Sequence, residues 1–317
     1  MARKRFEFVE GSSSKFWEVE LQEQNVTTWW GRIGTEGQSK TKDFGSAVKA
    51  QAEYEKLIEE KTNKGYEEVE DAPEGIDGPA LTALKSKLGV YAREAWKPKV
   101  KNGAGSALTA SKFSGIPWIP AGENWPECKN CQQPMQLFFQ LNLEQLPDDM
   151  QGRFGEGLLQ LFYCVENDCK GEQEAYFGNE TTMLTRIIMP NGNSTTFASS
   201  PVKDAFPVKE IVAWTRLPGE YPLLLELSSL GVELEEEEEE AFEQHFSPDD
   251  GDKLFGWPHW VQDLEYGTCK ICEGTMDLVM QIGSEDNLPY MFGDLGIGHI
   301  SQCKTHKDQM KFGWACS

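Results

Sequence analysis

The sequence predicts an α+β protein in which a small antiparallel sheet with one helix precedes a mainly β, internally duplicated domain. A strand–turn–helix pattern within residues 1–70 predicts the first part. A stretch that occurs twice, at residues 111–141 and 252–282, predicts the second. The two copies align without a gap at a constant offset, which places Cys128 over Cys269, and they are identical at nine positions. In each, alternating apolar residues follow a Cys-x2-Cys pair, which is typical of a strand with one buried face.

Residues 1–70 contain signals for strands, a turn and a helix. Two strands of alternating polarity are expected before residue 22, and two more around a glycine turn at residues 34–37. Ser46 is the expected cap of a helix that continues to Lys64, where Gly65 stops it. We therefore expect a small antiparallel sheet with one helix across it.

The second pair of these strands carries Trp30-Gly31-Arg32, followed by Ile33-Gly34, Gly37-Gln38 and a basic segment. In this setting the pattern resembles the WGR domain. In DNA-break-dependent poly(ADP-ribose) polymerases, the tryptophan and basic residues of that domain contact a DNA end. The resemblance therefore implies DNA binding by Trp30, Gly31, Arg32, Lys40 and Lys42, since an indole can stack on a base and cations can pair with phosphate. The alternative is that Trp30 is a core residue and Arg32 a surface charge.

Residues 66–80 are acidic and rich in proline and glycine, which indicates a linker. We therefore expect a WGR domain at 1–70, a linker and basic helix at 71–104, and a duplicated domain at 105–317, with halves at about 105–200 and 245–317. Six basic residues and only one acidic residue lie between Lys85 and Lys101. Such a run is typical of a solvated helix face and tail, and the alternative interpretation is a phosphate-binding segment.

Each copy of the repeat is followed by a third cysteine at a similar separation. Cys164 follows Cys131 at nearly the same distance along the chain as Cys303 follows Cys272. Zinc in a closed structural site takes four thiolate or imidazole ligands. The sequence thus predicts two zinc-knuckle-like sites, one formed by Cys128, Cys131, Cys164 and Cys169, the other by Cys269, Cys272, Cys303 and either His306 or Cys316.

Disulfides and redox chemistry are the competing interpretations of these cysteines. The chain starts without an apolar signal segment, so we expect a cytoplasmic location, where a reducing environment disfavours four disulfides. A redox Cys-x2-Cys pair normally opens a helix after a strand. Here Pro134 and a strand pattern follow the first pair, which favours metal binding.

The region beyond residue 105 resembles the YwqG-like family, a family without an agreed activity. The resemblance is carried by residues 112–117, 125–126, 140–143, 157–162, 253–258 and 293–298. Many YwqG-like proteins lack the cysteines, so a metal would be an addition to that fold. The Cys-x2-Cys pair and the strand after it also resemble the zinc modules of the programmed cell death protein 2 family, which act as ribosomal-protein chaperones.

The composition bounds the function. The net charge of −22 is concentrated in residues 71–317, which carry −19, and six consecutive glutamates occupy 235–240. An acidic body repels nucleic acid and suits a basic partner protein. No apolar run could span a membrane, and no phosphate-loop, dinucleotide or zinc-protease motif is present.

From these observations we expect a non-enzymatic zinc protein whose WGR module binds DNA, with no small-molecule substrate. One alternative is an interaction protein of the chaperone or immunity type, in which the acidic body holds a basic partner. A second is a hydrolase that uses the second metal site. The closed four-sulfur set of the first half disfavours catalysis, because a catalytic zinc keeps one position open.

Overall fold

The computed structural model describes residues 3–10, 13–33, 38–69, 79–103, 107–166, 168–169, 181–217 and 219–316. The chain divides into two compact units, Met1–Lys87 and Leu88–Ser317. The expected turn at 34–37 and residues 70–78 of the expected linker lie outside the described residues. Among the described residues, no helix is both long enough and apolar enough to cross a bilayer.

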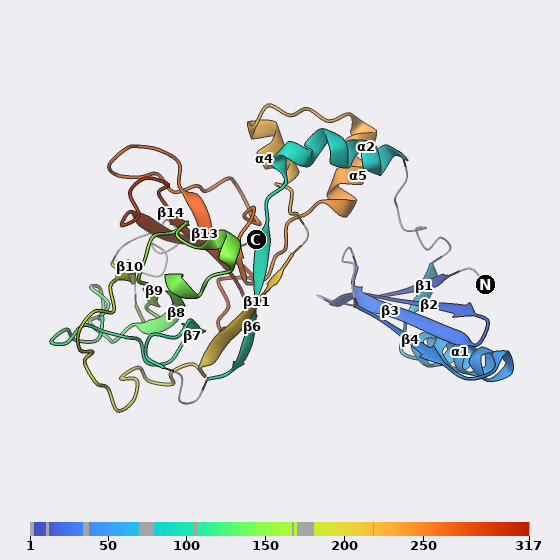
Figure 1. Cartoon of the computed structure of the whole chain (residues 1–317), viewed down its shortest axis with the longest axis horizontal. Helices are drawn as coiled ribbons and strands as arrows, with labels where there is room; N and C mark the ends of the chain where they lie inside the picture. The colour runs from blue at the N-terminus through green and yellow to red at the C-terminus, as the bar shows by residue number, and fades with distance from the viewer. Residues whose placement is uncertain are drawn as a thin grey trace. The chain divides into compact units, whose positions relative to one another are not determined.

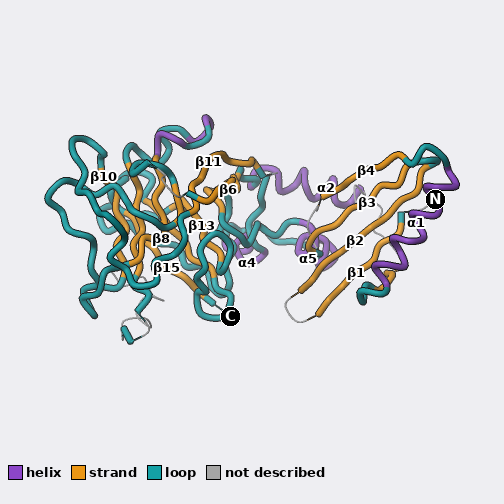
Figure 2. The backbone as a smooth tube through the Cα atoms, turned by 90° about the horizontal axis from the view of Figure 1, so that it is seen from below, coloured by secondary structure: helices purple, strands orange, loops and turns teal. Residues whose placement is uncertain are grey.

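The N-terminal unit is a five-stranded antiparallel sheet with one helix, α1 (Ala47–Thr62), which confirms the predicted sheet and helix (Figure 1). The strands run side by side in Figure 2. Residues 67–69, expected at the start of the linker, instead pair with the first strand as the fifth. The strands lie in the order β4-β3-β2-β1-β5, and their bounds are β1 Lys4–Glu10, β2 Ser13–Gln22, β3 Asn25–Arg32, β4 Gln38–Asp43 and β5 Glu67–Val69.

Helix α1 forms and docks for local reasons. The Ser46 side chain caps it by accepting a hydrogen bond from the Lys49 backbone N–H at 3.4 Å. Ala50 and Tyr54 lie on one helix face and are buried against the sheet. Their partners are alternate strand residues of β1, β2 and β3, namely Phe6, Trp17, Val19, Leu21 and Val26. Apolar residues recur at every second position of the strands and at about every fourth position of the helix. The side chains from both elements therefore meet in a single apolar layer.

The C-terminal unit contains a ten-stranded antiparallel sheet in the order β10-β9-β8-β7-β11-β6-β12-β13-β14-β15. The two end strands, β10 and β15, approach one another, so the sheet nearly closes into a barrel. Its strands are β6 Ala95–Asn102, β7 Lys112–Phe113, β8 Gln136–Asn142, β9 Leu158–Tyr163, β10 Met183–Ile188, β11 Lys209–Arg216, β12 Lys253–Phe255, β13 Asp277–Gly283, β14 Ile297–Gln302 and β15 Met310–Ala315.

Short helices account for the remaining regular structure in the described part of the chain. The α-helices are α2 (Pro79–Leu88), α4 (Leu224–Ser229) and α5 (Glu236–His245), and the 3₁₀ turns are Gly89–Tyr91, Leu143–Gln145 and Asp148–Met150. The six-glutamate run is thus the capped first half of α5, since Glu235 is its N-cap and forms a capping box with Glu238.

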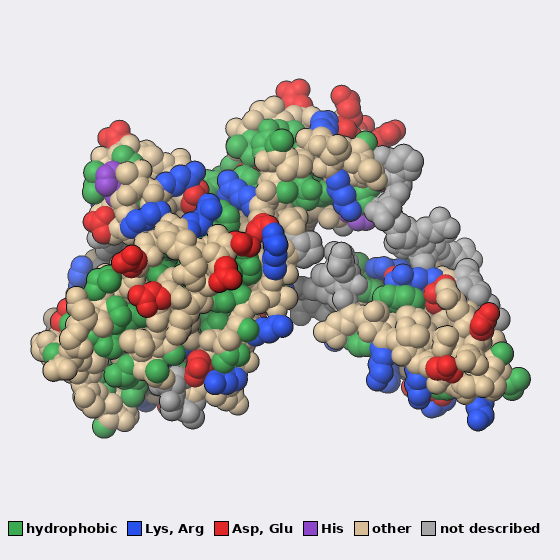
Figure 3. Space-filling view, viewed as in Figure 1, with side chains coloured by type: hydrophobic (Ala, Val, Ile, Leu, Met, Phe, Trp, Pro, Cys, Tyr) green, Lys and Arg blue, Asp and Glu red, His purple; other side chains and the backbone are tan. Residues whose placement is uncertain are grey.

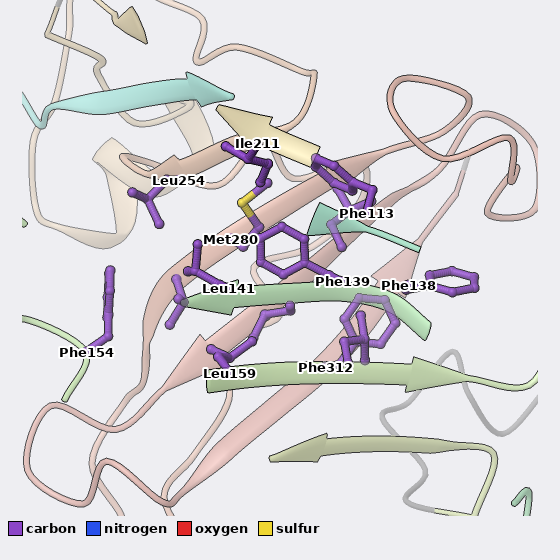
Figure 4. Packing of buried hydrophobic residues seen from close by; sticks show 14 of the residues in the cluster. Phe113, Phe138, Phe139, Leu141, Phe154, Leu159, Ile211, Leu254, Met280 and Phe312 are labelled. Carbon is purple, nitrogen blue, oxygen red and sulfur yellow. The ribbon is translucent and has the colours of Figure 1, made fainter. Parts of the chain in front are cut away.

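Aromatic and aliphatic side chains from both halves of the large sheet fill its interior. Figure 4 shows Phe113, Phe139 and Leu159 pointing into the same space as Met280 and Phe312. All five are at most 1% exposed. Because these strands come from residues 112–315, the core depends on long-range pairing and not on any one hairpin.

The strands β7-β8-β9-β10 and β12-β13-β14-β15 pair in the same order on either side of the central pair β11-β6. The same bulge interrupts both sets, between Leu137 and Phe139 and between Leu278 and Met280. The two bulges therefore occupy equivalent positions of the two sequence copies.

Residues 95–102, expected within a linker and basic helix, instead form β6 at the centre of the large sheet. Among the described residues of that segment, 79–88 are α-helical. The basic strand residues carry partners: the Lys97 ammonium lies 2.6 Å from Asp249, and that of Lys101 lies 3.6 Å from Glu210. Burial of Ala95 and Trp96 fixes the strand, and the lysines project from its exposed portions.

Candidate metal centres and nucleic-acid face

The first cysteine group joins two segments that are distant in sequence. Cys128 and Cys131 lie in the turn before β8, and Cys164 follows β9 directly. Their sulfurs and that of Cys169 all lie within 4.8 Å of one another. The Cys128–Cys169 and Cys131–Cys164 sulfur pairs are 3.8 and 3.6 Å apart.

These separations discriminate between a disulfide and a metal. A disulfide requires sulfurs about 2.05 Å apart, so neither pair is bonded. A tetrahedral zinc with Zn–S distances of about 2.3 Å places its sulfurs about 3.8 Å apart. The observed spacing therefore fits the edges of a metal-centred tetrahedron, and all four residues would act as ligands.

The second group has the same construction with one histidine. Cys269 and Cys272 precede β13, Cys303 follows β14, and His306 lies three residues further on. The Cys272 and Cys303 sulfurs are 3.6 Å apart, and His306 Nδ1 lies 3.5 Å from the Cys269 sulfur. For Zn–N of about 2.0–2.1 Å the expected sulfur–nitrogen edge is about 3.6 Å. This set of donors also fits zinc.

The two turns that present the cysteine pairs have the same backbone geometry. The N–H of Cys128 donates to Gln133 and that of Cys269 to Gly274, at 2.9 and 3.0 Å. One residue in each turn, Gln132 and Glu273, adopts a left-handed φ, 61° and 56°. Such a tight turn brings the two sulfurs of each pair to one side, as a knuckle requires.

Cys316, the alternative fourth ligand, lies elsewhere. It packs at the edge of the apolar core, close to Gly293, and does not belong to the group of sulfur and nitrogen donors. The sequence left the two residues as alternatives, with a slight preference for His306 because Cys303-x2-His306 is a short pair like Cys164-x4-Cys169.

In the second group, hydrogen bonds favour the thiolate form of Cys269 and Cys303, whereas the pKa of Cys272 is raised. The backbone N–H of His306 donates to the Cys303 sulfur and lowers the pKa of that thiol to about 6. A separate contact, between the His306 ring nitrogen Nδ1 and the Cys303 sulfur at 3.7 Å, raises the pKa of His306. In the first group, burial raises the pKa of Cys131 and Cys164. A cation is the charge that would stabilise the four cysteines of this group, three of them buried, in thiolate form.

Three of the proposed DNA-binding residues, Trp30, Lys40 and Lys42, share one face of the N-terminal sheet. Trp30 lies opposite Trp17 and Gln38, and Lys40 and Lys42 follow at alternate positions of β4. Side chains at alternate positions point to the same face, which is the α1 face. Trp30 is 36% exposed and lies outside the apolar cluster. Gly31 and Arg32 end β3, and the Arg32 side chain lies outside the described part of the structure.

Sequence reasoning missed a second basic group beside that face. The Lys61 ammonium lies 4.7 Å from the centre of the Tyr66 ring and 5.3 Å from that of Trp17. Burial lowers the pKa of Lys61, and the neighbouring Lys64 and Lys15 charges lower it further. Clustering of like charges on one surface marks an anion-binding candidate. The positions 15, 61 and 64 are too far apart in sequence to be recognised as one group.

Charge is distributed unevenly over the surface. Figure 3 shows lysine and arginine side chains on the N-terminal unit. Acidic side chains gather over the region of α5 in the C-terminal unit, where Glu236, Glu237, Glu239 and Glu240 are exposed. Residues 1–70 carry a net charge of only −3.

Two family models match the chain. A model of the WGR domain matches residues 2–73, and one described as "Domain of unknown function (DUF1963)" matches residues 111–312. The second match covers most of the C-terminal unit and includes all four residues of each candidate metal group.

Individual proteins match shorter stretches. Protein YehF of Escherichia coli (strain K12) is 39% identical over 83 residues, which are 26% of this chain and 30% of that protein. The uncharacterized protein YfeS of the same organism is 33% identical over 66 residues, 21% of this chain and 27% of its own length. A crystal structure of a Bacteroides fragilis protein is 39% identical over 22% of this chain and 20% of its own, with a TM-score of 0.22. The chain thus spans less than a third of the curated relatives that it matches.

Proposed function

The chain belongs to the DUF1963 family and carries a WGR domain ahead of its DUF1963 region. We propose that it is a non-enzymatic, cytoplasmic protein. In this proposal two structural zinc ions stabilise the DUF1963 region, and the WGR domain binds DNA ends. The observation that carries the DNA proposal is Trp30, a large exposed aromatic residue on the same sheet face as Lys40 and Lys42. An exposed indole beside cations is suited to stacking and phosphate contact.

The proposed zinc ions would be held by Cys128, Cys131, Cys164 and Cys169, and by Cys269, Cys272, Cys303 and His306. Four protein ligands leave no open position, so zinc would supply folding energy and no Lewis-acid chemistry. Each site would fasten the turn before one strand to the end of the next. We further propose that the region arose by internal duplication, because the strand order, the bulges and the ligand turns all recur.

The test of DNA binding uses the full-length chain and two duplexes of identical sequence. One has blunt ends, and the other is closed at both ends by hairpin loops. We expect tighter binding to the open duplex, and log K should fall by about 0.9 per neutralised phosphate for each log unit of salt. Trp30→Ala should weaken binding to the open duplex by about 1–3 kcal/mol if the indole stacks on a base.

Two matched tryptophans serve as controls. Trp29→Ala removes a half-buried indole from the opposite face, where Arg3 stacks on it, and should leave DNA affinity unchanged. Trp17→Ala should cost about 3–5 kcal/mol of stability, because Trp17 is only 3% exposed. A folded Trp30→Ala protein with wild-type affinity, or equal binding to the closed duplex, would contradict end binding by this face.

A basic partner protein is the second candidate, favoured by the exposed glutamates of α5. The probe is a lysine-rich peptide, titrated at two salt concentrations. Replacing Glu236, Glu237, Glu239 and Glu240 by glutamine should reduce its affinity, whereas the same number of changes among exposed acidic residues elsewhere should not. An unchanged affinity would remove α5 as the docking element.

A further inference from the structure

Corresponding positions of the two strand sets can be read from their registers. Gln140 pairs with Gln160, and Gln281 with His299, so Gln160 and His299 correspond. On the next strand, Gln160 pairs with Arg186 and His299 with Gly313. In the same way, Phe162 corresponds to Ser301, because they pair with Leu137 and Leu278.

In the first set, large side chains fill the space at these positions. The Arg186 guanidinium donates to the Gln160 side chain at 3.0 Å and to Glu123 at 2.9 Å, and it lies 5.8 Å from the Phe162 ring. Phe162 is fully buried and packs edge-on against Trp125 at 6.2 Å. In the first strand set, the side chains of Arg186 and Phe162 therefore fill this space, and each contacts neighbouring residues.

In the second set, serine and glycine replace that phenylalanine and arginine, and a cavity of about 250 Å³ lies there. Its walls include Trp260, Tyr266, His299, Ser301, Lys311 and Gly313. A Cβ placed on Gly313 would meet no atom within 4 Å, and the residue has an ordinary strand φ. The opening is therefore due to missing side chains and not to a distorted backbone.

His299 is one of the residues that line this cavity, and one of its buried polar atoms has no partner in the described part of the chain. The residue is only 6% exposed, and its Nε2 has no hydrogen-bond partner among the described residues. Its other ring nitrogen bonds to the backbone of His259, and burial lowers the pKa of the imidazole to about 3. The ring is then neutral with its proton on Nδ1, so that Nε2 offers a lone pair. A buried acceptor without a partner is destabilising, and a ligand that donates a hydrogen bond to it would remove that cost.

Hydrogen bonds to one buried carboxylate fix the two aromatic side chains of the cavity wall, Trp260 and Tyr266. The Trp260 indole N–H donates to Glu226 at 3.1 Å, and the Tyr266 hydroxyl donates to the other oxygen of the same carboxylate. Trp260 also packs against His299, with ring centroids 4.8 Å apart. Lys311 and Glu265 bring opposite charges to the wall, so the cavity does not select a strongly charged molecule.

We propose that this cavity binds a small, uncharged, planar heterocycle of about nucleobase size, whose N–H donates to His299 Nε2 while its ring packs on Trp260. The size is adequate, since an engineered apolar cavity of about 150 Å³ holds benzene. A flat aromatic molecule matches the indole wall. The proposal is independent of DNA binding and of zinc, because neither Trp30 nor any metal-group residue lines the cavity.

The test compares two probes that differ only in the donor. Indole carries one N–H, and benzofuran is nearly the same shape with an oxygen in its place. Binding of each to the full-length protein is measured by titration with ligand-observed NMR. We expect indole to bind at least about tenfold more tightly, as one hydrogen bond to a buried acceptor implies.

Variants locate the probe. Gly313→Arg restores the arginine of the other strand set and should abolish indole binding, whereas Val212→Arg, at an exposed position on β11, should not. His299→Leu should remove the preference for indole, and His299→Gln, which keeps an acceptor as Gln160 does, should retain it. If Gly313→Arg fails to fold, the comparison of His299→Leu with His299→Gln still tests whether indole binds in this cavity.

Three results would overturn the proposal. Indole could fail to bind up to its solubility limit, or benzofuran could bind equally well. Finally, His299→Leu could bind indole as the wild type does.

Discussion

At the scale of single residues, identical side chains take different roles according to their burial. Trp17 and Trp30 lie opposite one another on β2 and β3, but 3% of the first and 36% of the second is exposed. The sequence could not separate a core from a contact role for Trp30, since both positions fit the same alternation. Trp17 packs in the apolar cluster that contains Ala50 and Tyr54 of α1, whereas Trp30 lies outside that cluster.

His299 makes a residue-scale prediction about pH. Its pKa is about 3 in the folded chain and 6.5 ordinarily. Between these values the unfolded chain binds a proton that the folded chain does not, so stability falls as the pH drops below about 6.5. On going from pH 7 to pH 5, the wild type should lose about 2 kcal/mol more than His299→Gln.

Urea unfolding of both proteins at the two pH values measures this difference. Comparison of the two cancels the acid sensitivity of the metal ligands, which they share. Equal losses in the two proteins would show that His299 is not buried in neutral form.

At the scale of elements, two buried glutamines fasten loops to strands. Gln140 accepts from the Trp118 N–H and donates to the carbonyls of Leu108 and Ala110, with distances of 2.7–3.1 Å. Gln281 makes the corresponding three bonds to His259, Asp249 and Gly251, at 2.8–2.9 Å. Every partner stands at the same sequence offset from its counterpart as the two copies of the repeat do. Each glutamine therefore holds the segment before β7 or β12 against the next strand.

Replacing either glutamine by leucine should destabilise the C-terminal unit severely. Replacing Gln281 removes the partner of one N–H and of two carbonyls, whereas after replacement of Gln140 the Leu108 carbonyl keeps its bond from the Lys112 ammonium at 3.2 Å. We expect a loss of about 3 kcal/mol or more for Gln281→Leu and a somewhat smaller loss for Gln140→Leu. Exposed Gln262 on a loop of the same unit is the control, and its replacement by leucine should cost under about 1 kcal/mol. Chemical denaturation of the three variants checks this, and a small loss for Gln281→Leu would refute the fastening role.

Local patterns predicted much of the secondary structure. The Ser46-capped helix and the alternating strands β1, β2 and β8 follow from periods that neighbouring residues set. The pairing of β6 with β11 and β12 did not follow, because its lysines resembled a solvated tail. The cavity could not be predicted from the sequence either. Small residues at positions 301 and 313 indicate an opening only when the strands that pair with them are known. Cysteine spacing predicted two groups whose donor atoms lie within 4.8 Å of one another in the structure, and it favoured His306 only slightly over Cys316 as the fourth donor of the second set.

At the scale of the whole molecule, the two compact units differ in their cysteine content. All eight cysteines lie beyond residue 127, so a cysteine metal site can stabilise the C-terminal unit only, and the N-terminal unit has its own apolar cluster. Charge is also divided, because residues 71–317 carry −19 of the total −22. The proposed DNA-binding unit is therefore the less acidic one, and the acidic remainder should keep its affinity for DNA modest.

Chelation should affect the two units differently. Because metal binding by closed thiolate sites contributes directly to folding, a strong chelator should lower the melting temperature of the C-terminal unit and leave the N-terminal one unchanged. Hydrogen exchange followed by mass spectrometry reports on each unit separately. Equal deprotection of α1 and β8 on chelation would contradict this separation.

The metal content of the purified full-length protein tests the central claim most directly. We predict close to two zinc ions per chain by elemental analysis, with all thiols reduced. Cys316→Ala should also retain two, because Cys316 lies outside the second group, and Cys128→Ser should retain about one. Less than about half an equivalent of zinc in the wild type, with the cysteines paired as disulfides, would contradict the account.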